Sequence, residues 1–120
     1  MWNVVEAGFV EEFFFRAVLQ GRLALALRSD VAAAAAACVL FGLAHAPGYA
    51  LRGGAIADGL GAHPPALVAV AYAIAVPSAA GVLFAYLWVR TRNLDFGIFL
   101  HGAIDAISNA DAAARLFGLV

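Results

Sequence analysis

Three charged side chains lie close together in a strongly apolar part of the sequence. Glu11, Glu12 and Arg16 are surrounded by Val, Leu and Phe residues, and the segment 13–15 is three consecutive Phe residues. Charge is costly to take out of water, so ionisable residues at membrane depth are rare and usually functional. A carboxylate in such a setting is a candidate general base. We therefore expect this cluster to form part of a functional site.

Helical geometry separates the roles of the two carboxylates. At about 100° per residue, Glu12 and Arg16 lie about 40° apart on one helix face and are placed to form an ion pair. Glu11 lies about 100° away from Glu12 and is not matched by that arginine. The ion pair is therefore expected to be structural, and Glu11 is the carboxylate left for chemistry. The alternative is that all three charges only face a polar interior.

Two further polar clusters occur at a spacing that suits a helix. The segment 41–45 (FGLAH) ends in His45, and the segment 101–105 (HGAID) begins with His101 and ends with Asp105. His101 and Asp105 are four residues apart, so both face the same way. Taken alone, His45 could contact lipid headgroups, and His101 and Asp105 could pair on a helix surface. Because all three clusters lack partners unless they meet, we expect them to converge.

Two chemistries fit these residues. Glu11, His45 and His101 could bind a zinc ion and leave one coordination position for water. Alternatively, Glu11 and His45 could activate a water without metal, while His101 and Asp105 orient or stabilise the group that the water attacks. The HExxH zinc signature is absent, so the metal question stays open.

The composition places the site in a membrane. Hydrophobic residues make up 65% of the chain and charged residues 12%, whereas a soluble domain is about half apolar and about a quarter charged. The apolar runs are continuous and do not alternate as lipid-facing strands would. The basic residues are dispersed arginines, which gives no reason to expect a nucleic-acid partner. The bilayer itself is the expected partner.

The pattern predicts an all-α, polytopic helical membrane protein with about four transmembrane helices in a single domain over 1–120. Pro47 and Gly48 are expected to end the second helix, a Gly-rich loop follows at 48–64, and Pro77 is expected to kink the third helix. Residues 109–120 are expected to form at most a short interfacial helix. The four predicted helices cover 3–28, 30–45, 66–90 and 94–108.

The three clusters, in this order, resemble the motifs of the CPBP intramembrane protease family, which includes CAAX prenyl proteases and bacteriocin-processing enzymes. The family pattern is EExxxR, then FxxxH, then HxxxN or HxxxD. The segment from 81 to 94 also resembles the third conserved helix of the family and its turn. The resemblance covers nearly the whole chain.

The resemblance implies a membrane endopeptidase that cleaves membrane-associated peptides, including prenylated CAAX-type peptides, in a prokaryotic plasma membrane. It implies that Glu11 is the general base, that His45 helps to position the water, and that His101 and Asp105 form the oxyanion site. Asp105 departs from the commoner Asn. An ionised Asp repels an oxyanion, so Asp105 must be protonated, must mainly orient His101, or must mark an altered activity.

A second departure is length, because family members usually carry further helices before the first motif. The chain is therefore expected to represent the conserved core without those upstream helices.

Two other functions compete with peptidase activity. A non-catalytic scaffold or bacteriocin self-immunity protein on the same fold would keep the Glu12–Arg16 pair but tolerate loss of Glu11. A transporter or proton pathway would need polar residues along the third helix, where few occur. Substitution of Glu11 discriminates the first two functions.

Overall fold

The computed structural model describes residues 6–57, 59–110 and 114, and all regular structure in this part of the chain is helical. This confirms the all-helical prediction. The start of the first predicted helix, at residue 3, and most of the 109–120 tail lie outside the described residues. The elements are η1 (Glu6–Glu11), η2 (Phe13–Gln20), α2 (Gly21–Leu27), α3 (Asp30–Arg52), η3 (Gly53–Ala55), α4 (Ala66–Ala75), α5 (Pro77–Thr91) and α6 (Leu94–Ser108).

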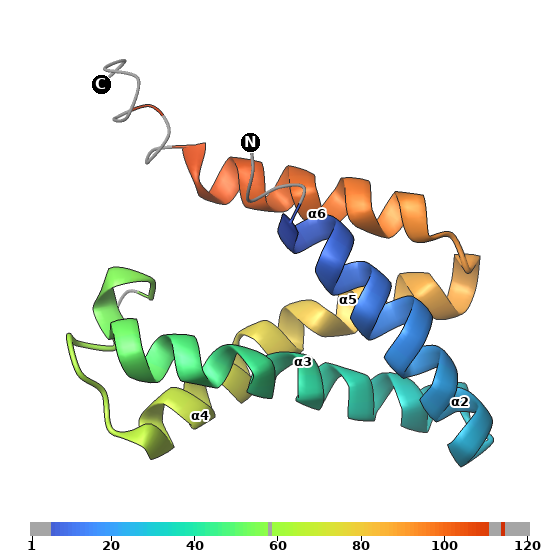
Figure 1. Ribbon diagram of the computed structural model, residues 1–120, viewed down its shortest axis with the longest axis horizontal. Helices are drawn as coiled ribbons and strands as arrows, with labels where there is room; N and C mark the ends of the chain where they lie inside the picture. Colours follow the sequence, from blue (N-terminus) through green and yellow to red (C-terminus); the bar gives the residue numbers. More distant parts are fainter. Residues whose placement is uncertain (1–5, 58, 111–113, 115–120) are drawn as a thin grey trace.

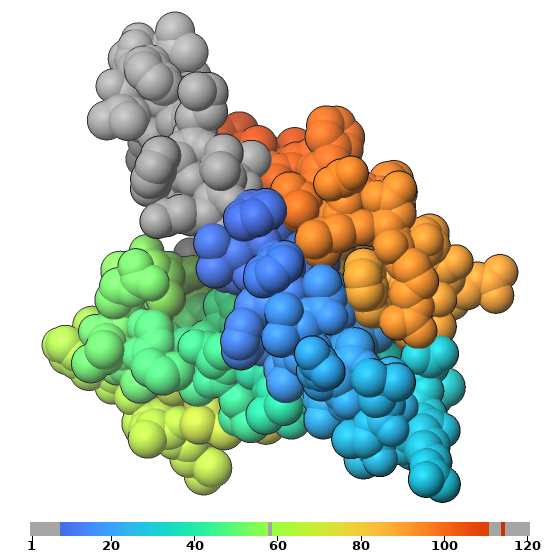
Figure 2. Space-filling model, turned by 45° about the vertical axis from the view of Figure 1, so that its right-hand side comes forward, coloured from blue at the N-terminus to red at the C-terminus, as the bar shows by residue number. Residues whose placement is uncertain are grey.

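Helix α3 is the central element of the arrangement. It packs against α4 and α5, which cross it in the view of Figure 1, and against η2 and α2. Helix α6 packs against η1, η2 and α5. Figure 2 shows η1 and η2 (blue) lying over α3 (green) and beside α6 (orange). The first helical stretch is therefore the element that joins α3 to α6.

Charged and apolar side chains are distributed in the opposite way to a soluble protein. The largest fully buried side chains are Arg16, Gln20 and Glu12, each 1% exposed, whereas Phe13 and Phe14 are 47% and 51% exposed. Lys, Glu, Arg and Asp are almost never fully buried in soluble domains unless paired. Apolar side chains on the outside and charges on the inside suit a chain whose surroundings are lipid.

Two helical stretches in the described part of the chain are long and apolar enough to cross a membrane. They are Asp30–Ala55, with a mean hydropathy of 1.7, and Ala66–Thr91, with a mean hydropathy of 2.1. Both correspond to predicted spanning helices. Each has 26 residues, which at 1.5 Å per residue exceeds a hydrocarbon core of about 30 Å.

The first helical stretch is wound differently from the prediction. Its segments Glu6–Glu11 and Phe13–Gln20 are π-helical, with hydrogen bonds that reach five residues back, as from the Gly21 N–H to the Arg16 carbonyl. Apart from Glu12, regular α-geometry begins at Gly21. Short π-helical turns are frequent at functional sites, and here the winding includes Glu11. The side-chain pattern gave no indication of it.

Helix α3 begins as predicted but ends later. The Ser29 Oγ accepts a hydrogen bond of 3.1 Å from the Ala32 N–H and caps the helix. The prediction that Pro47 ends it is wrong, since α3 continues to Arg52 with Pro47 inside. Proline removes one backbone donor, but tertiary contacts can carry a helix past this loss. Such contacts are present here, because Ala46 is buried and Tyr49 packs against Tyr72 of α4.

The predicted kink at Pro77 is confirmed. The third predicted helix consists of α4 and α5, which meet at Val76 with φ of −103° and ψ of −65°. Next to the break, the Ser78 Oγ lies 3.5 Å from the Ala73 carbonyl oxygen. The fourth predicted helix coincides with α6, where the Asn93 side chain caps the Phe96 N–H.

Gly42 lets α3 approach this kink closely. A Cβ at Gly42 would contact the Ser78 Oγ and the Ala73 carbonyl oxygen. We expect Gly42→Ala to lower the free energy of unfolding by about 1–3 kcal/mol, the usual range for overpacking. Thermal unfolding in lipid or detergent measures this loss.

Gly21→Ala is the matched control for Gly42→Ala. A Cβ at Gly21 would contact only the Arg16 carbonyl oxygen, at 3.9 Å. Gly-to-Ala changes in open helix positions stabilise by up to about 1 kcal/mol. Equal melting temperatures for the two variants would contradict the close packing of α3 at the kink.

Candidate active site

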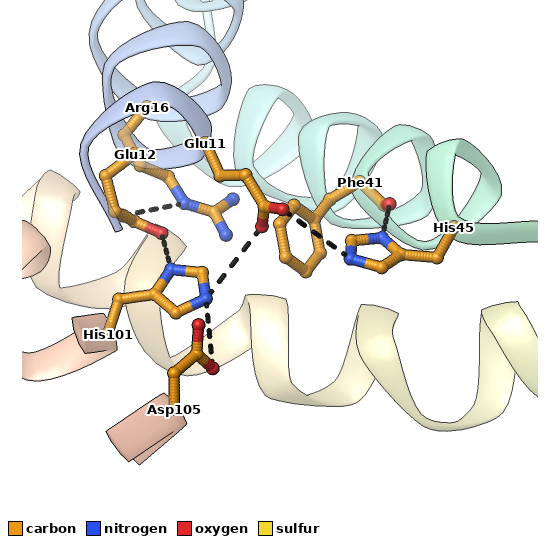
Figure 3. A network of polar contacts seen from close by, with 7 residues as sticks. All are labelled: Glu11, Glu12, Arg16, Phe41, His45, His101 and Asp105. Carbon is orange, nitrogen blue, oxygen red and sulfur yellow. Dashed lines mark hydrogen bonds and ion pairs between the residues drawn. The ribbon is translucent and has the colours of Figure 1, made fainter. Parts of the chain in front are cut away.

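The three polar clusters converge between η1, α3 and α6, as expected (Figure 3). Glu11 is central: its Oε1 lies 3.9 Å from the His45 Nε2, and its Oε2 lies 3.8 Å from the His101 Nε2. The Asp105 Oδ1 lies 3.9 Å from the same His101 nitrogen. All four predicted site residues are thus brought together around the Glu11 carboxylate.

The predicted ion pair is present and has an additional partner. The Arg16 Nε donates to the Glu12 Oε2 at 3.3 Å, with both side chains almost completely buried. The other Glu12 oxygen, Oε1, lies 2.9 Å from the His101 Nδ1. Sequence reasoning missed this contact, although a carboxylate has two acceptor oxygens and the arginine occupies only one. Glu12 therefore ties the first helical stretch to α6 and fixes the His101 ring.

His45 is oriented by its own helix. Its Nδ1 lies 2.8 Å from the Phe41 carbonyl oxygen. A carbonyl can only accept, so the hydrogen is assigned to Nδ1. In the neutral ring the Nε2 is then an acceptor, and it faces Glu11. The spacing between Phe41 and His45 thus determines which nitrogen of His45 is presented to the site.

Two aromatic rings surround the buried guanidinium. The Arg16 Cζ lies 5.0 Å from the ring centre of Phe41 and 5.9 Å from that of Phe84. Phe84 also stacks on His101, with ring centres 4.7 Å apart. Cation–π attraction is stronger when the cation is desolvated. It partly offsets the lack of hydrogen bonds from Arg16 Nη1 and Nη2 to other described residues. The role of Phe84 was not predicted.

Gly81 makes room for this arrangement. A Cβ at Gly81 would lie 3.2 Å from the Phe41 Cδ1 and 3.6 Å from the Arg16 Nη2. The first of these distances is tighter than most side chains tolerate, so a larger residue would displace the Phe41 ring. Helix α5 therefore contributes the Phe84 ring and, at Gly81, the space that the Phe41 ring and the Arg16 guanidinium need.

A cavity of about 350 Å³ opens beside Glu11 and His45. Both of these side chains are about one third exposed. A concave, partly apolar cavity that a carboxylate and an imidazole reach has the features of a substrate-binding site. The cavity is lined by Glu11, Phe15, Ala44, His45, Gly48, Tyr49, Arg52 and Ile56.

The zinc site that the sequence left open does not fit the residues as they are placed. Within residues 6–57, 59–110 and 114, no group of three or more His, Cys, Asp or Glu side chains could hold a metal ion. No chemical step is therefore assigned to zinc.

The described residues form an apolar, all-helical structure with paired charges buried between its helices and two helical stretches that are long enough to cross a membrane, which is typical of an integral membrane protein. Within that class, the chain belongs to the Rce1-like family: residues 1–107 match the family model described as type II CAAX prenyl endopeptidase Rce1-like. This is a membrane-embedded protease family, and the match confirms the resemblance found in the three motifs. No curated protein and no solved structure matches the chain.

Proposed function

We propose that the protein is an intramembrane endopeptidase that hydrolyses peptide bonds of membrane-associated or prenylated CAAX-type peptides. The observation that carries this proposal is the position of Glu11 between two histidine nitrogens, 3.9 Å from His45 Nε2 and 3.8 Å from His101 Nε2. Family membership supports the protease class. The residue roles rest on the geometry of the site.

In the proposed mechanism a water lies between Glu11 and His45. Their contact of 3.9 Å is too long for a direct hydrogen bond, and a water that contacts both groups can bridge a separation of this size. With His45 neutral, both groups are acceptors, so the water donates one hydrogen to each. Its lone pair is then free to attack the carbonyl carbon of the scissile bond. Glu11 takes the proton of the water and passes it to the leaving nitrogen.

His101 is the proposed donor to the developing oxyanion. With both ring nitrogens protonated, His101 donates from Nδ1 to Glu12, and its Nε2 proton points into the gap shared by Glu11 and Asp105. A fixed donor at the position where negative charge develops stabilises the transition state. Glu12 already orients the His101 ring, and the Asp105 Oδ1 lies 3.9 Å from the His101 Nε2. Asp105 therefore contributes to the oxyanion site only when it is protonated.

The proposed topology has four transmembrane helices in a single domain that acts as the protease core, in a prokaryotic plasma membrane. The two long apolar stretches supply two of the spans. The other two are the first helical stretch, which begins with η1 and carries Glu11, and α6, which carries His101. Lipid is the surrounding partner, and the substrate reaches the site from or near the bilayer.

The purified protein in lipid vesicles is expected to cleave members of a membrane-peptide library with and without a zinc chelator. The physical reason is that Glu11 and His45 together supply the proton acceptor and the orientation of the water. Mass spectrometry of the products measures the cleavage. Cleavage that is lost with the chelator and restored by added zinc would contradict the metal-free mechanism and leave the peptidase assignment in place.

A further inference from the structure

One cationic side chain lines the cavity that holds the Glu11–His45 pair. Arg52 lies in the last turn of α3, on the cavity wall with Gly48, Tyr49 and Ile56. His45 and Arg52 are seven residues apart on the same α-helix, which places them on one face, about 20° apart. The cavity thus has a candidate catalytic carboxylate at one place and a guanidinium at another.

The Arg52 side chain turns back toward the site. Its Nη2 would lie 3.6 Å from a Cβ placed at Gly48, one turn nearer to His45. No carboxylate in the described part of the chain lies within ion-pair distance of Arg52. Of the other arginines described, Arg16 and Arg92 each have an acidic partner, whereas Arg22, Arg28 and Arg90 have none but do not line the cavity. Within the described residues, Arg52 is therefore a cation without an anionic partner at the edge of the cavity.

A guanidinium presents a planar fork of donors that matches a carboxylate. We propose that Arg52 binds a carboxylate of the substrate and so determines which peptides are cleaved and where. The inference rests on the proposed peptidase function and deepens it. The carboxylate can be the free C-terminus of the peptide or an Asp or Glu side chain. In either case it lies on the substrate within a few residues of the scissile bond, because His45 and Arg52 are only about 10 Å apart along α3.

The test compares one short apolar peptide in two forms, with a free C-terminal carboxylate and as the C-terminal amide. For the wild type we expect kcat/KM to be roughly 10-fold or more higher for the acid, the size of a charge-assisted hydrogen bond. Arg52→Gln is expected to bring the acid-to-amide ratio close to one, and Arg52→Lys to retain part of it. Arg22→Gln, which changes an arginine on α2 that does not line the cavity, is the matched control and should keep the ratio.

A second pair of peptides identifies the source of the carboxylate. It replaces an internal Glu near the scissile bond by Gln, with the C-terminus amidated. An Arg52-dependent preference for the Glu peptide would assign the recognised group to a side chain. If Arg52→Gln lowers kcat/KM equally for every peptide, or does not change it for any, the proposal is overturned. Arg52 would then be a contact to lipid headgroups or to the end of α3.

Binding to the Glu11→Gln variant separates this proposal from the peptidase function. Fluorescently labelled acid and amide peptides are titrated onto Glu11→Gln vesicles, with and without Arg52→Gln. We expect tighter binding of the acid only when Arg52 is present, whether or not the wild type turns the peptide over. Equal binding of both forms to Glu11→Gln would overturn the assignment of Arg52. A wild type that cleaves neither form would instead count against the proposed function.

Discussion

Replacing Glu11 with Gln is expected to lower the rate of peptide cleavage by about 100-fold or more, the lower end of what general base catalysis contributes. Gln has nearly the same shape but cannot accept the proton of the attacking water. Cleavage of one membrane peptide in vesicles, followed by mass spectrometry, measures the rate. The melting temperature is expected to stay near that of the wild type, because Glu11 is only partly buried and is not tied to Arg16.

The matched control for this change is Asp95→Asn. Asp95 is an exposed carboxylate in the first turn of α6, where the same acid-to-amide change leaves the site residues untouched. It is expected to cleave at a rate close to the wild type. If Glu11→Gln and Asp95→Asn retain equal activity, Glu11 is not the base, and the non-catalytic scaffold gains weight over the peptidase.

Replacing Arg16 with Met is expected to destabilise the fold strongly. Arg16 is 1% exposed and pairs with Glu12, which is equally buried. Removing one partner of a buried pair leaves the other charge uncompensated, at a cost of about 3–5 kcal/mol. The loss also removes the cation that Phe41 and Phe84 surround. Unfolding of the purified variant in detergent measures the change.

The double variant Glu12→Gln with Arg16→Met separates charge imbalance from lost packing. It removes both charges, and Gln can still accept from the His101 Nδ1. We expect its loss of stability to be smaller than the sum of the two single losses, the usual result for interacting neighbours. Additive losses, or an Arg16→Met protein as stable as the wild type, would contradict the structural role of the pair.

Much of the site could be predicted from the sequence, because a charged side chain in an apolar chain needs a polar partner and few are present. The spacing of Glu12 and Arg16 predicted their ion pair, and the isolation of His45 and His101 on separate helices predicted convergence on Glu11. The helical period of the sequence and the chemistry of its side chains are sufficient for such conclusions, because burying a charged side chain without a partner is so costly.

Other parts could not be predicted, since they depend on tertiary contacts. The helix continues past Pro47 because side chains beyond it, such as Tyr49, pack on α4. The π-helical winding around Glu11 leaves no mark in the residue pattern. The contact between Glu12 and His101 joins residues 89 positions apart, and a single sequence does not show which of several acceptors a histidine will meet.

Family membership favours the peptidase over the two competing functions. A transporter would need a polar path along α4 and α5. Within the described part of these helices, Ser78 is buried, but its hydroxyl contacts the Ala73 carbonyl. Among the described residues, Glu12, His45, His101 and Asp105 instead gather around Glu11.

The most direct test of the central claim is a single-turnover cleavage in water labelled with heavy oxygen, with Glu11→Gln as the blank. If a water activated by Glu11 and His45 attacks the peptide carbonyl, the new carboxyl group carries one labelled oxygen from the first turnover, and the blank yields almost no product in the time of one wild-type turnover. A first-turnover product without label would mean that a side-chain oxygen attacked instead of water. Labelled product from Glu11→Gln at the wild-type rate would equally contradict the mechanism.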